Sequence, residues 1–380
     1  MTFDRRREAF PSLAAGIHLV SHSLGPMPRE ARGSMARYLD RWEGYARENA
    51  WKAEWWELSR TVGDRIERLL GAPSGTVQIQ PNASVALQVA ASCLDFSSGA
   101  RRKIVTTALE FPTTEYIWRE QERAGARFEI VPTDDGIETP MDRLIEAIDE
   151  ETALVSISHA SYRSSFLLDP RPVVERAHSV GALVLLDVYQ TAGVLPLDLA
   201  AWEVDFAVGG TIKWLCGGPA CGYLYVRQER IETLAPRLTG WIAHEKPFDF
   251  ASGRIRFASG VRRFAQGTPA IASLYSCLPG IEILLEVGPD VIAQESRRRT
   301  QRLVEEARAR GWVLRSPADP ARRGGTVMLG ANDPERLEAE LSSRGVAVDW
   351  RPGIIRVSPH FFNTDEEVEQ ALEILSTLVP

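Results

Sequence analysis

Cysteine is scarce in this sequence: the four residues of this type are Cys93, Cys216, Cys221 and Cys277. None of them forms the CxxC spacing of zinc ribbons and redox motifs, so a structural zinc site and a disulfide framework are both disfavoured. Histidine forms one close pair, His18 and His22, and no acidic residue accompanies that pair. We interpret the pair as structural or substrate-facing, with His22 as a candidate substrate contact, and we predict no bound metal.

Phosphate-binding loops and long apolar runs are also missing. The chain contains neither GxGxxG nor GxxxxGK[ST], which argues against a Rossmann dinucleotide site and a P-loop. No run approaches the ~20 apolar residues of a membrane span, and the opening residues, MTFDRRRE, lack the apolar core of a signal peptide. The net charge of −7 disfavours a nucleic-acid surface. We therefore expect a cytoplasmic protein that binds neither nucleic acid nor membrane.

The composition is that of a globular protein, with 380 residues of which 44% are hydrophobic and 25% charged. This length suggests two domains, or one large domain with a satellite. Between about residues 75 and 230, short β-rich runs alternate with helical patterns, which is typical of a mostly parallel sheet covered on both faces. The expected strands are 103–107, 127–131, 153–158, 183–186, 206–208 and 223–226, and the expected helices are 84–94, 114–124, 141–148 and 171–180.

After about residue 265 the pattern changes. A charge-rich helical stretch runs from roughly 270 to 310, and short strands follow within 346–357. The last helix is expected to begin at Thr364, where Glu367 completes a capping box. This change predicts a smaller α+β domain in the last third of the chain.

Asp187 and Lys213 are the most informative residues. Asp187 ends the expected strand 183–186, and Lys213 follows the next one, 206–208. Parallel strands deliver such residues to one edge of the sheet, where α/β proteins bind ligands. A carboxylate that keeps a pyridine nitrogen protonated and a lysine that forms a Schiff base are what pyridoxal phosphate requires. The alternative is that both residues are solvated charges at strand ends.

Further candidates lie elsewhere along the chain. The helix after Asn82 offers N–H groups and Ser84 to a phosphate, although simple capping by either residue uses the same geometry. Phe111 follows an expected strand and can stack on a flat ring, or only pack. Gln190 can donate to a phenolic ring oxygen. Arg356 can grip a substrate α-carboxylate in a bidentate fork, or form a surface salt bridge.

A set of short stretches follows one specific order: residues 23–28, 82–84, 111–113, Asp187, Lys213, 240–244, 267–269 and 356–360. In this order they resemble the class V aminotransferase superfamily of fold-type I pyridoxal phosphate enzymes. Within that superfamily, the resemblance is greatest to kynureninase. The resemblance covers most of the chain. It implies an α/β fold with a mostly parallel, seven-stranded-type sheet in a large domain, residues 15–265, and a smaller α+β domain built from residues 1–14 and 266–380.

The resemblance also implies a role for each site residue. Lys213 and Asp187 form the catalytic pair, the first as the Schiff-base lysine and the second on the pyridine nitrogen. Phe111 stacks on the ring, and Arg356 and His22 bind the substrate. The other implied cofactor-binding residues are Ala83, Ser84, Thr113, Ser158, Gln190, Trp241 and Thr268, the last from the neighbouring subunit of a homodimer.

Two positions depart from kynureninase. Gln190 replaces a histidine and matches the cysteine desulfurase branch, and Ile212 replaces a tyrosine directly before the lysine. A desulfurase would need a mobile cysteine, and residues 315–348 contain none. We expect a pyridoxal phosphate-dependent lyase or hydrolase that acts on an α-amino acid, in which Lys213 takes the α-proton before cleavage of a Cβ–Cγ or Cβ–S bond. Transamination, and a non-catalytic binding protein of the same fold, are the alternatives.

Overall fold

The computed structural model describes residues 3–378, and its largest feature is a seven-stranded sheet in the order β2-β8-β7-β6-β5-β3-β4. The strands are β2 (Val77–Gln80), β3 (Lys103–Thr107), β4 (Arg127–Val131), β5 (Thr152–Ser158), β6 (Leu183–Asp187), β7 (Phe206–Gly210) and β8 (Gly222–Val226). All neighbours pair in parallel except at β8, which is antiparallel to both β7 and β2. The predicted α/β class with a mostly parallel, seven-stranded sheet is therefore confirmed.

Thirteen α-helices accompany the strands in the described part of the chain. They are α1 (Phe3–Glu8), α2 (Glu30–Glu43), α3 (Trp56–Leu70), α4 (Ala83–Ser92), α5 (Pro112–Glu120), α6 (Met141–Glu146), α7 (Pro170–Ser179), α8 (Leu199–Trp202), α9 (Gln228–Ile231), α10 (Ile271–Val287), α11 (Pro289–Ala309), α12 (Pro334–Ser343) and α13 (Asp365–Leu378). The predicted stretch 270–310 is thus two helices, which meet at Gly288 with a bend of 85°.

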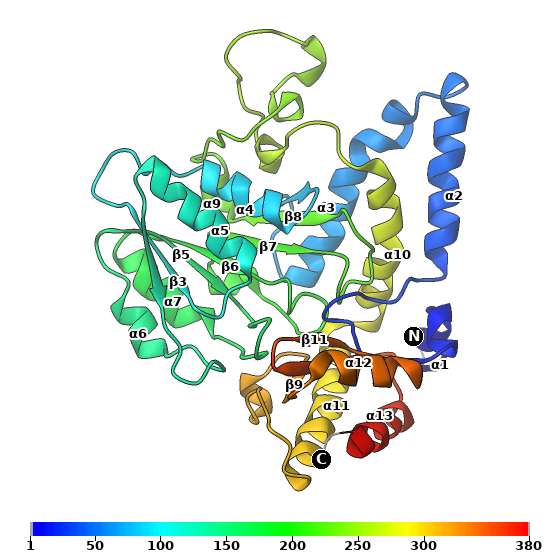
Figure 1. Ribbon diagram of the computed structural model, residues 1–380. Coiled ribbons are helices and arrows are strands. Elements are labelled where there is room, and N and C mark those ends of the chain that lie inside the picture. The colour runs from blue at the N-terminus through cyan, green and yellow to red at the C-terminus, as the bar shows by residue number, and fades with distance from the viewer. Residues whose placement is uncertain (1–2, 379–380) are drawn as a thin grey trace.

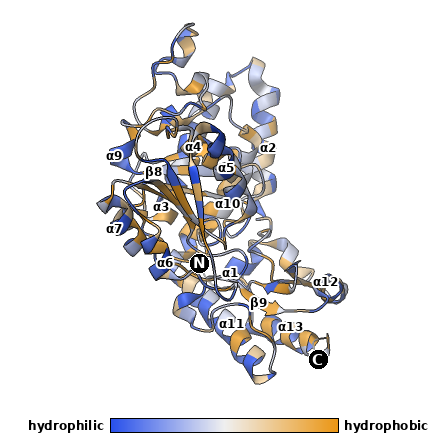
Figure 2. Ribbon diagram, turned by 60° about the vertical axis from the view of Figure 1, so that its left-hand side comes forward, coloured by the Kyte–Doolittle hydropathy of each residue, from blue (hydrophilic) through white to orange (hydrophobic). Residues whose placement is uncertain are grey.

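Both faces of the large sheet are buried, which is why its strands read as continuous apolar runs. In β6, Val184 and Leu186 join one apolar core, and Leu185 joins the other. Helices α4 and α5 cover the face of Leu185, and α6 and α7 cover the opposite face (Figure 1). Figure 2 shows the same layering, with hydrophobic strands enclosed by helices that turn hydrophilic residues outward. The loops at the carboxyl ends of the strands are left to form a site.

A smaller unit lies below the large sheet in the view of Figure 1. Its antiparallel sheet has the order β11-β12-β9, and β1 pairs in parallel with β10. These strands are β1 (Ile17–His18), β9 (Val327–Gly330), β10 (Val346–Ala347), β11 (Asp349–Arg351) and β12 (Ile354–Val357). Helices α11, α12 and α13 pack on them around a separate apolar core. This is the smaller α+β unit expected from the sequence.

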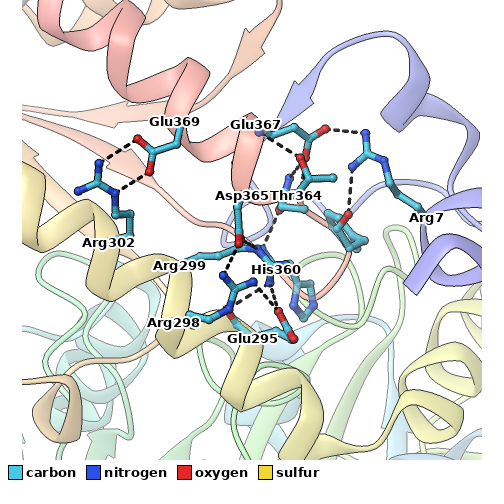
Figure 3. Close-up of polar contacts among 12 residues, drawn as sticks. Arg7, Glu295, Arg298, Arg299, Arg302, His360, Thr364, Asp365, Glu367 and Glu369 are labelled. Carbon is cyan, nitrogen blue, oxygen red and sulfur yellow. Dashed lines mark hydrogen bonds and ion pairs between the residues drawn. The ribbon is translucent and has the colours of Figure 1, made fainter. Parts of the chain in front are cut away.

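The last helix begins as predicted. Thr364 N–H donates to Glu367 Oε2 (3.0 Å), and Glu367 N–H donates to Thr364 Oγ1 (3.1 Å), which are the two halves of a capping box. Ion pairs fasten α13 to its neighbours (Figure 3): Arg302 of α11 contacts Glu369, and Arg7 of α1 contacts Glu367. The beginning of the chain is therefore attached to its last helix.

Two apolar cores draw on segments that are far apart in the chain, and the predicted domain boundaries, 15–265 and 1–14 with 266–380, stay a prediction. Phe10, Leu13 and α10 contribute to the core of the large sheet, whereas Ile17 and Leu19 contribute to the core of the smaller unit. The reason is the pairing of β1 with β10, a contact between distant segments that no local pattern reveals. Within residues 3–378, no single helix is long and apolar enough to cross a membrane, and only the bent pair α10–α11 passes that test by length and composition.

The segment after β1 crosses from the smaller unit to the large sheet. Ser358 N–H donates to Leu19 O (2.8 Å), and Gly25 N–H donates to Ile212 O (2.8 Å). A Cβ at Gly25 would lie 2.2 Å from Lys213 O, so only glycine lets the segment pass so close to the loop after β7. The N-terminal segment therefore covers the loop that carries Lys213.

Candidate active site

The carboxyl ends of β5, β6 and β7 bring the central predicted residues together. Asp187 ends β6 opposite Ser158 of β5, and Lys213 follows the end of β7. Lys213 Nζ lies 4.1 Å from the ring centroid of Tyr189 and 6.0 Å from that of Phe111. These side chains line a cavity of about 220 Å³. The predicted residues in its lining are Ala83, Ser84, Phe111, Thr113, Ser158, Asp187, Gln190 and Lys213.

Burial shifts the protonation of both central residues. It raises the pKa of Asp187, while the Tyr189 N–H group 2.8 Å from Oδ1 and the charge of Lys213 act in the opposite direction. Burial also lowers the pKa of Lys213 to about 8, opposed by Asp187 and assisted by the positive charge of Arg356. Near pH 8 a large share of Lys213 side chains is therefore neutral and nucleophilic.

Two helices begin at this cavity. Asn82 caps α4, because its Oδ1 accepts the N–H of Val85 (2.9 Å), and Ser84 of the first turn lines the cavity. Thr113, in the first turn of α5, lines it as well. A Cβ at Gly222 of β8 would lie 2.4 Å from the carbonyl carbon of Asn82, so glycine lets the sheet approach the start of α4. The first N–H groups of a helix attract anions, so this end of the cavity suits a phosphate.

Gln190 connects three parts of the site. Its Nε2 donates to the carbonyl of His22 (3.2 Å), and its Oε1 accepts from Trp214 Nε1 (3.2 Å). The side chain therefore joins the N-terminal segment to the loop after Lys213. Donation from Gln190 to a ring oxygen of the cofactor stays a prediction. The second N–H of Nε2, which is not used on His22, is available for it.

Sequence reasoning missed two residues of the site. Glu110 accepts from Thr107 Oγ1 (2.7 Å), Ser158 N (3.1 Å) and Ser158 Oγ (2.5 Å), and burial raises its pKa to about 7. It fixes Ser158 beside Asp187. Tyr189 places its ring under Lys213 Nζ. The available signal was their position: one directly precedes Phe111, and the other lies between Asp187 and Gln190.

Arg356 is not at the surface, so the alternative of a surface salt bridge is wrong. Its side chain is 2% exposed and pairs with Asp349, which lies opposite it across β11 and β12. Arg356 Nη1 also donates to the carbonyl of Tyr162 (3.3 Å), a residue of the cavity lining. His22 Nε2 lies 3.7 Å from Asp349 Oδ2. The two predicted substrate-binding residues, Arg356 and His22, thus meet at one carboxylate beside the cavity.

Trp241 and Thr268 are absent from the lining of this cavity in the described chain. Thr268 lines a separate cavity of about 530 Å³ together with Trp51 and Trp55. Trp241 packs against Trp56, with ring centroids 6.4 Å apart, and is 37% exposed. Their predicted contacts with the cofactor, which for Thr268 require a neighbouring subunit, stay predictions.

The donor set of the cavity fits pyridoxal phosphate. Asp187 is suited to the protonated ring nitrogen, Phe111 and Tyr189 offer aromatic faces, and the amine of Lys213 is suited to the carbonyl carbon. The starts of α4 and α5 are suited to the phosphate. Each group of the cofactor thus has a counterpart of the right chemistry in the lining.

Known proteins resemble the chain over nearly its full length. The chain is 30% identical over 374 residues to the uncharacterized aminotransferase YcbU of Bacillus subtilis (strain 168), covering 97% of this chain and 96% of that protein. It is 29% identical over 388 residues to the kynureninase of Geobacillus thermodenitrificans (strain NG80-2), covering 98% of this chain and 90% of that protein.

Solved structures show the same fold at lower identity. A cysteine desulfurase from Thermococcus onnurineus NA1, in its apo form, matches with a TM-score of 0.88 and 20% identity over 99% of this chain and 98% of that one. The cystine C–S lyase C-DES, in complex with its reaction product cysteine persulfide, matches with a TM-score of 0.85 and 20% identity over 97% of this chain and 99% of that one. At this identity the likeness establishes the fold.

The model of one family, aminotransferase class V, matches residues 18–371. This range includes every predicted site residue, from His22 to Arg356. Pyridoxal phosphate is the cofactor of that family, so the cofactor predicted from the sequence is confirmed. The family consists of enzymes, which removes the alternative of a non-catalytic binding module. A match over nearly the whole chain, and a cavity with the chemistry of the cofactor, show that this protein belongs to the aminotransferase class-V family.

Proposed function

We propose that the protein is a pyridoxal phosphate-dependent lyase or hydrolase that cleaves at the β-carbon of an α-amino acid. The observation that carries the proposal is the convergence of Lys213, Asp187 and Arg356 at one cavity and its rim. Kynureninases, at 28–30% identity, support a reaction at the β-carbon. The named activity of C-DES, a cystine C–S lyase, points to the same carbon atom.

Most of the site residues would hold the cofactor or the substrate, and one, Lys213, would transfer a proton. When bound, pyridoxal phosphate supplies a carbonyl carbon that condenses with amines and a ring that withdraws electrons from the α-carbon of the substrate. Asp187 would hold the ring nitrogen, and Ser84 and Thr113 the phosphate. Arg356 would bind the α-carboxylate. Lys213 Nζ, in its neutral form, would accept the α-proton of the substrate and return it later.

The thiols of the chain argue against a desulfurase that carries a persulfide on its own cysteine. Burial raises the pKa of Cys93 to about 12, and it raises the pKa of Cys216 as well. Raised pKa values disfavour the thiolate, which is the nucleophilic form. Residues 315–348 contain no cysteine. A β-fragment cleaved here would therefore leave as a free product.

Cofactor loading is expected to follow the protonation of Lys213. Because the pKa of Lys213 is lowered to about 8, the neutral amine increases as the pH rises through 8. A lysine with the ordinary pKa of 10.5 would show the same increase in neutral amine at a pH more than two units higher. The measurement is the rate at which the visible absorbance of bound cofactor appears in apoprotein between about pH 6 and pH 11. A midpoint above about pH 10 would contradict the shift.

Substrate assays test the proposed reaction. We expect the visible band of the holoenzyme to shift with one of L-kynurenine, L-cysteine or a cysteine S-conjugate, and the matching β-fragment to be released. Gln190 and Ile212, which stand where kynureninases carry histidine and tyrosine, favour the sulfur substrates over L-kynurenine. Stoichiometric conversion of the cofactor to pyridoxamine phosphate by amino acid alone, with no β-fragment, would replace the proposal by transamination.

We also propose that the protein works as a homodimer with shared sites. Trp241 and Thr268, which the resemblance assigns to the cofactor, lie outside the cavity of their own chain. Large hydrophobic side chains near Trp241 are exposed, including Phe248 (58%) and Phe250 (77%). Such a group of aromatics supports an interface at this side of the molecule.

A further inference from the structure

Arg356 already holds a carboxylate of its own chain. Its Nε donates to Asp349 Oδ1 (3.1 Å) and its Nη2 to Asp349 Oδ2, so the guanidinium fork is filled from within the protein. The two residues lie directly opposite one another in the antiparallel pair of β11 and β12, which fixes the contact. A substrate carboxylate that binds Arg356 must therefore compete with Asp349.

Asp349 has a second set of partners beside the first. Arg351 Nη1 lies 2.8 Å from Asp349 Oδ1, and His22 Nε2 lies 3.7 Å from Asp349 Oδ2. The His22 side chain is 1% exposed, and its Nε2 has no hydrogen-bond partner among the described residues. Leaving a buried ring nitrogen unpaired is costly. A small movement of the Asp349 carboxylate toward His22 would supply the missing partner once Nε2 carries the ring proton.

The Ser358 hydroxyl decides which His22 nitrogen carries the single ring proton. Burial and the charge of Arg356 lower the pKa of His22 to about 3, so the ring is neutral. Ser358 Oγ donates to Leu19 O (3.0 Å) and lies 2.6 Å from His22 Nδ1, so Nδ1–H donates to Oγ and Nε2 turns a lone pair toward Asp349. When the hydroxyl turns to donate to Nδ1 instead, the ring proton lies on Nε2, and Nε2–H can then receive the Asp349 carboxylate.

Protonation does not open the pair between Asp349 and Arg356. Although burial alone would raise it, the nearby His22 ring and the hydrogen-bonded Arg356 hold the pKa of Asp349 well below its usual range. Only another anion can then compete for Arg356. The cluster contains two guanidinium groups, of Arg351 and Arg356, around one carboxylate. The cluster therefore has a net charge of one positive unit. This excess charge can be neutralised by one anion from outside, such as a single α-carboxylate.

We propose that Asp349 is an exchangeable internal stand-in for the substrate carboxylate. It fills the fork of Arg356 in the free enzyme, and an incoming α-carboxylate displaces it toward His22 Nε2–H and Arg351. This role of Asp349 rests on the proposed function, in which Arg356 binds the substrate carboxylate. It makes His22 a positioning residue that receives Asp349. The apparent affinity for a carboxylate is then the intrinsic affinity multiplied by the fraction of molecules in which Arg356 is free of Asp349.

The test compares two probes that differ only in the carboxylate, L-alanine and L-alaninamide. Their dissociation constants are measured from the shift of the visible band of the holoenzyme, in the wild type, in Asp349→Asn and in Asp365→Asn. We expect Asp349→Asn to bind L-alanine about tenfold more tightly and L-alaninamide unchanged, because Arg356 is then free in most molecules. Asp365, at the start of α13, is a surface partner of Arg298 on α11. Asp365→Asn is expected to change neither dissociation constant.

Two further variants separate the possible failures. Arg351→Gln removes a receiving group without emptying Arg356, so it is expected to weaken L-alanine binding and leave L-alaninamide binding unchanged. If Asp349→Asn binds L-alanine no more tightly than the wild type, or if Arg351→Gln leaves L-alanine binding intact, the exchange is refuted. The assignment of Arg356 itself fails only if Arg356→Gln keeps the preference of the wild type for L-alanine over L-alaninamide.

Discussion

Replacing Lys213 by alanine is expected to reduce turnover by about 10³-fold or more. Lys213 is the amine in the lining of the cavity, and its lowered pKa makes it both the nucleophile for the cofactor and the base for the α-proton. The substitution removes both roles at once. The measurement is kcat with the best substrate found in the spectral screen, together with the amount of cofactor that survives dialysis.

A lysine outside the cavity serves as the control for this variant. Lys52 is exposed and lines neither cavity, so Lys52→Ala removes the same charge and chain length without touching the site. It is expected to keep wild-type turnover. Near-normal turnover by a folded Lys213→Ala protein, with a melting temperature like that of the control, would refute the assignment of Lys213 and with it the proposed chemistry.

The second large effect is expected at Asp187. Asparagine at this position can still accept the N–H of Tyr189, so the loop after β6 keeps its shape while the negative charge is lost. Without that charge a pyridine nitrogen is no longer held in its protonated form, and the electron-withdrawing power of the ring falls. We expect kcat to decrease on the order of 10²–10³-fold, the usual effect of removing one preorganised electrostatic contact.

Cofactor content and spectrum separate this electrostatic effect from a loss of binding. Asp187→Asn is expected to retain pyridoxal phosphate, because Lys213 and the starts of α4 and α5 are unchanged. Its visible band is expected to change position, whereas that of Asp365→Asn is not. Full activity in Asp187→Asn would show that this carboxylate does not serve the ring nitrogen.

Asp187 and Lys213 could be recognised from the sequence because parallel strands have a simple geometry. Each buried strand ends at the same edge of the sheet, so a polar residue just after each one has a known destination. The bounds of β3 and β4 were predictable from their short β-rich runs, and the capping box at Thr364 because its contacts lie within a few residues. Local patterns therefore gave the parts of the site that depend on strand ends and helix starts.

Asp349 and Glu110 could not be recognised in this way. Asp349 acts on Arg356 through the register of a hairpin and on His22 through a contact between segments more than 300 residues apart. Glu110 acts through Ser158 on another strand. The position of Glu110 directly before Phe111 marks it as a neighbour of the site, but no local pattern reveals its contact with Ser158 or those of Asp349. The same holds for the packing of α10 with the large sheet, which depends on the arrangement of whole elements.

The crossing of the N-terminal segment has a consequence for biosynthesis. Leu19 accepts a hydrogen bond from Ser358, and Gly25 donates one to Ile212, so this segment is held by residues near both the middle and the end of the chain. While the ribosome is still translating the large domain, β12 and Ser358 do not yet exist. The segment that covers the Lys213 loop then lacks its attachment to Ser358, and the Arg356 pair is absent. The nascent chain therefore reaches a site that can bind the substrate carboxylate only after β12 has emerged and packed.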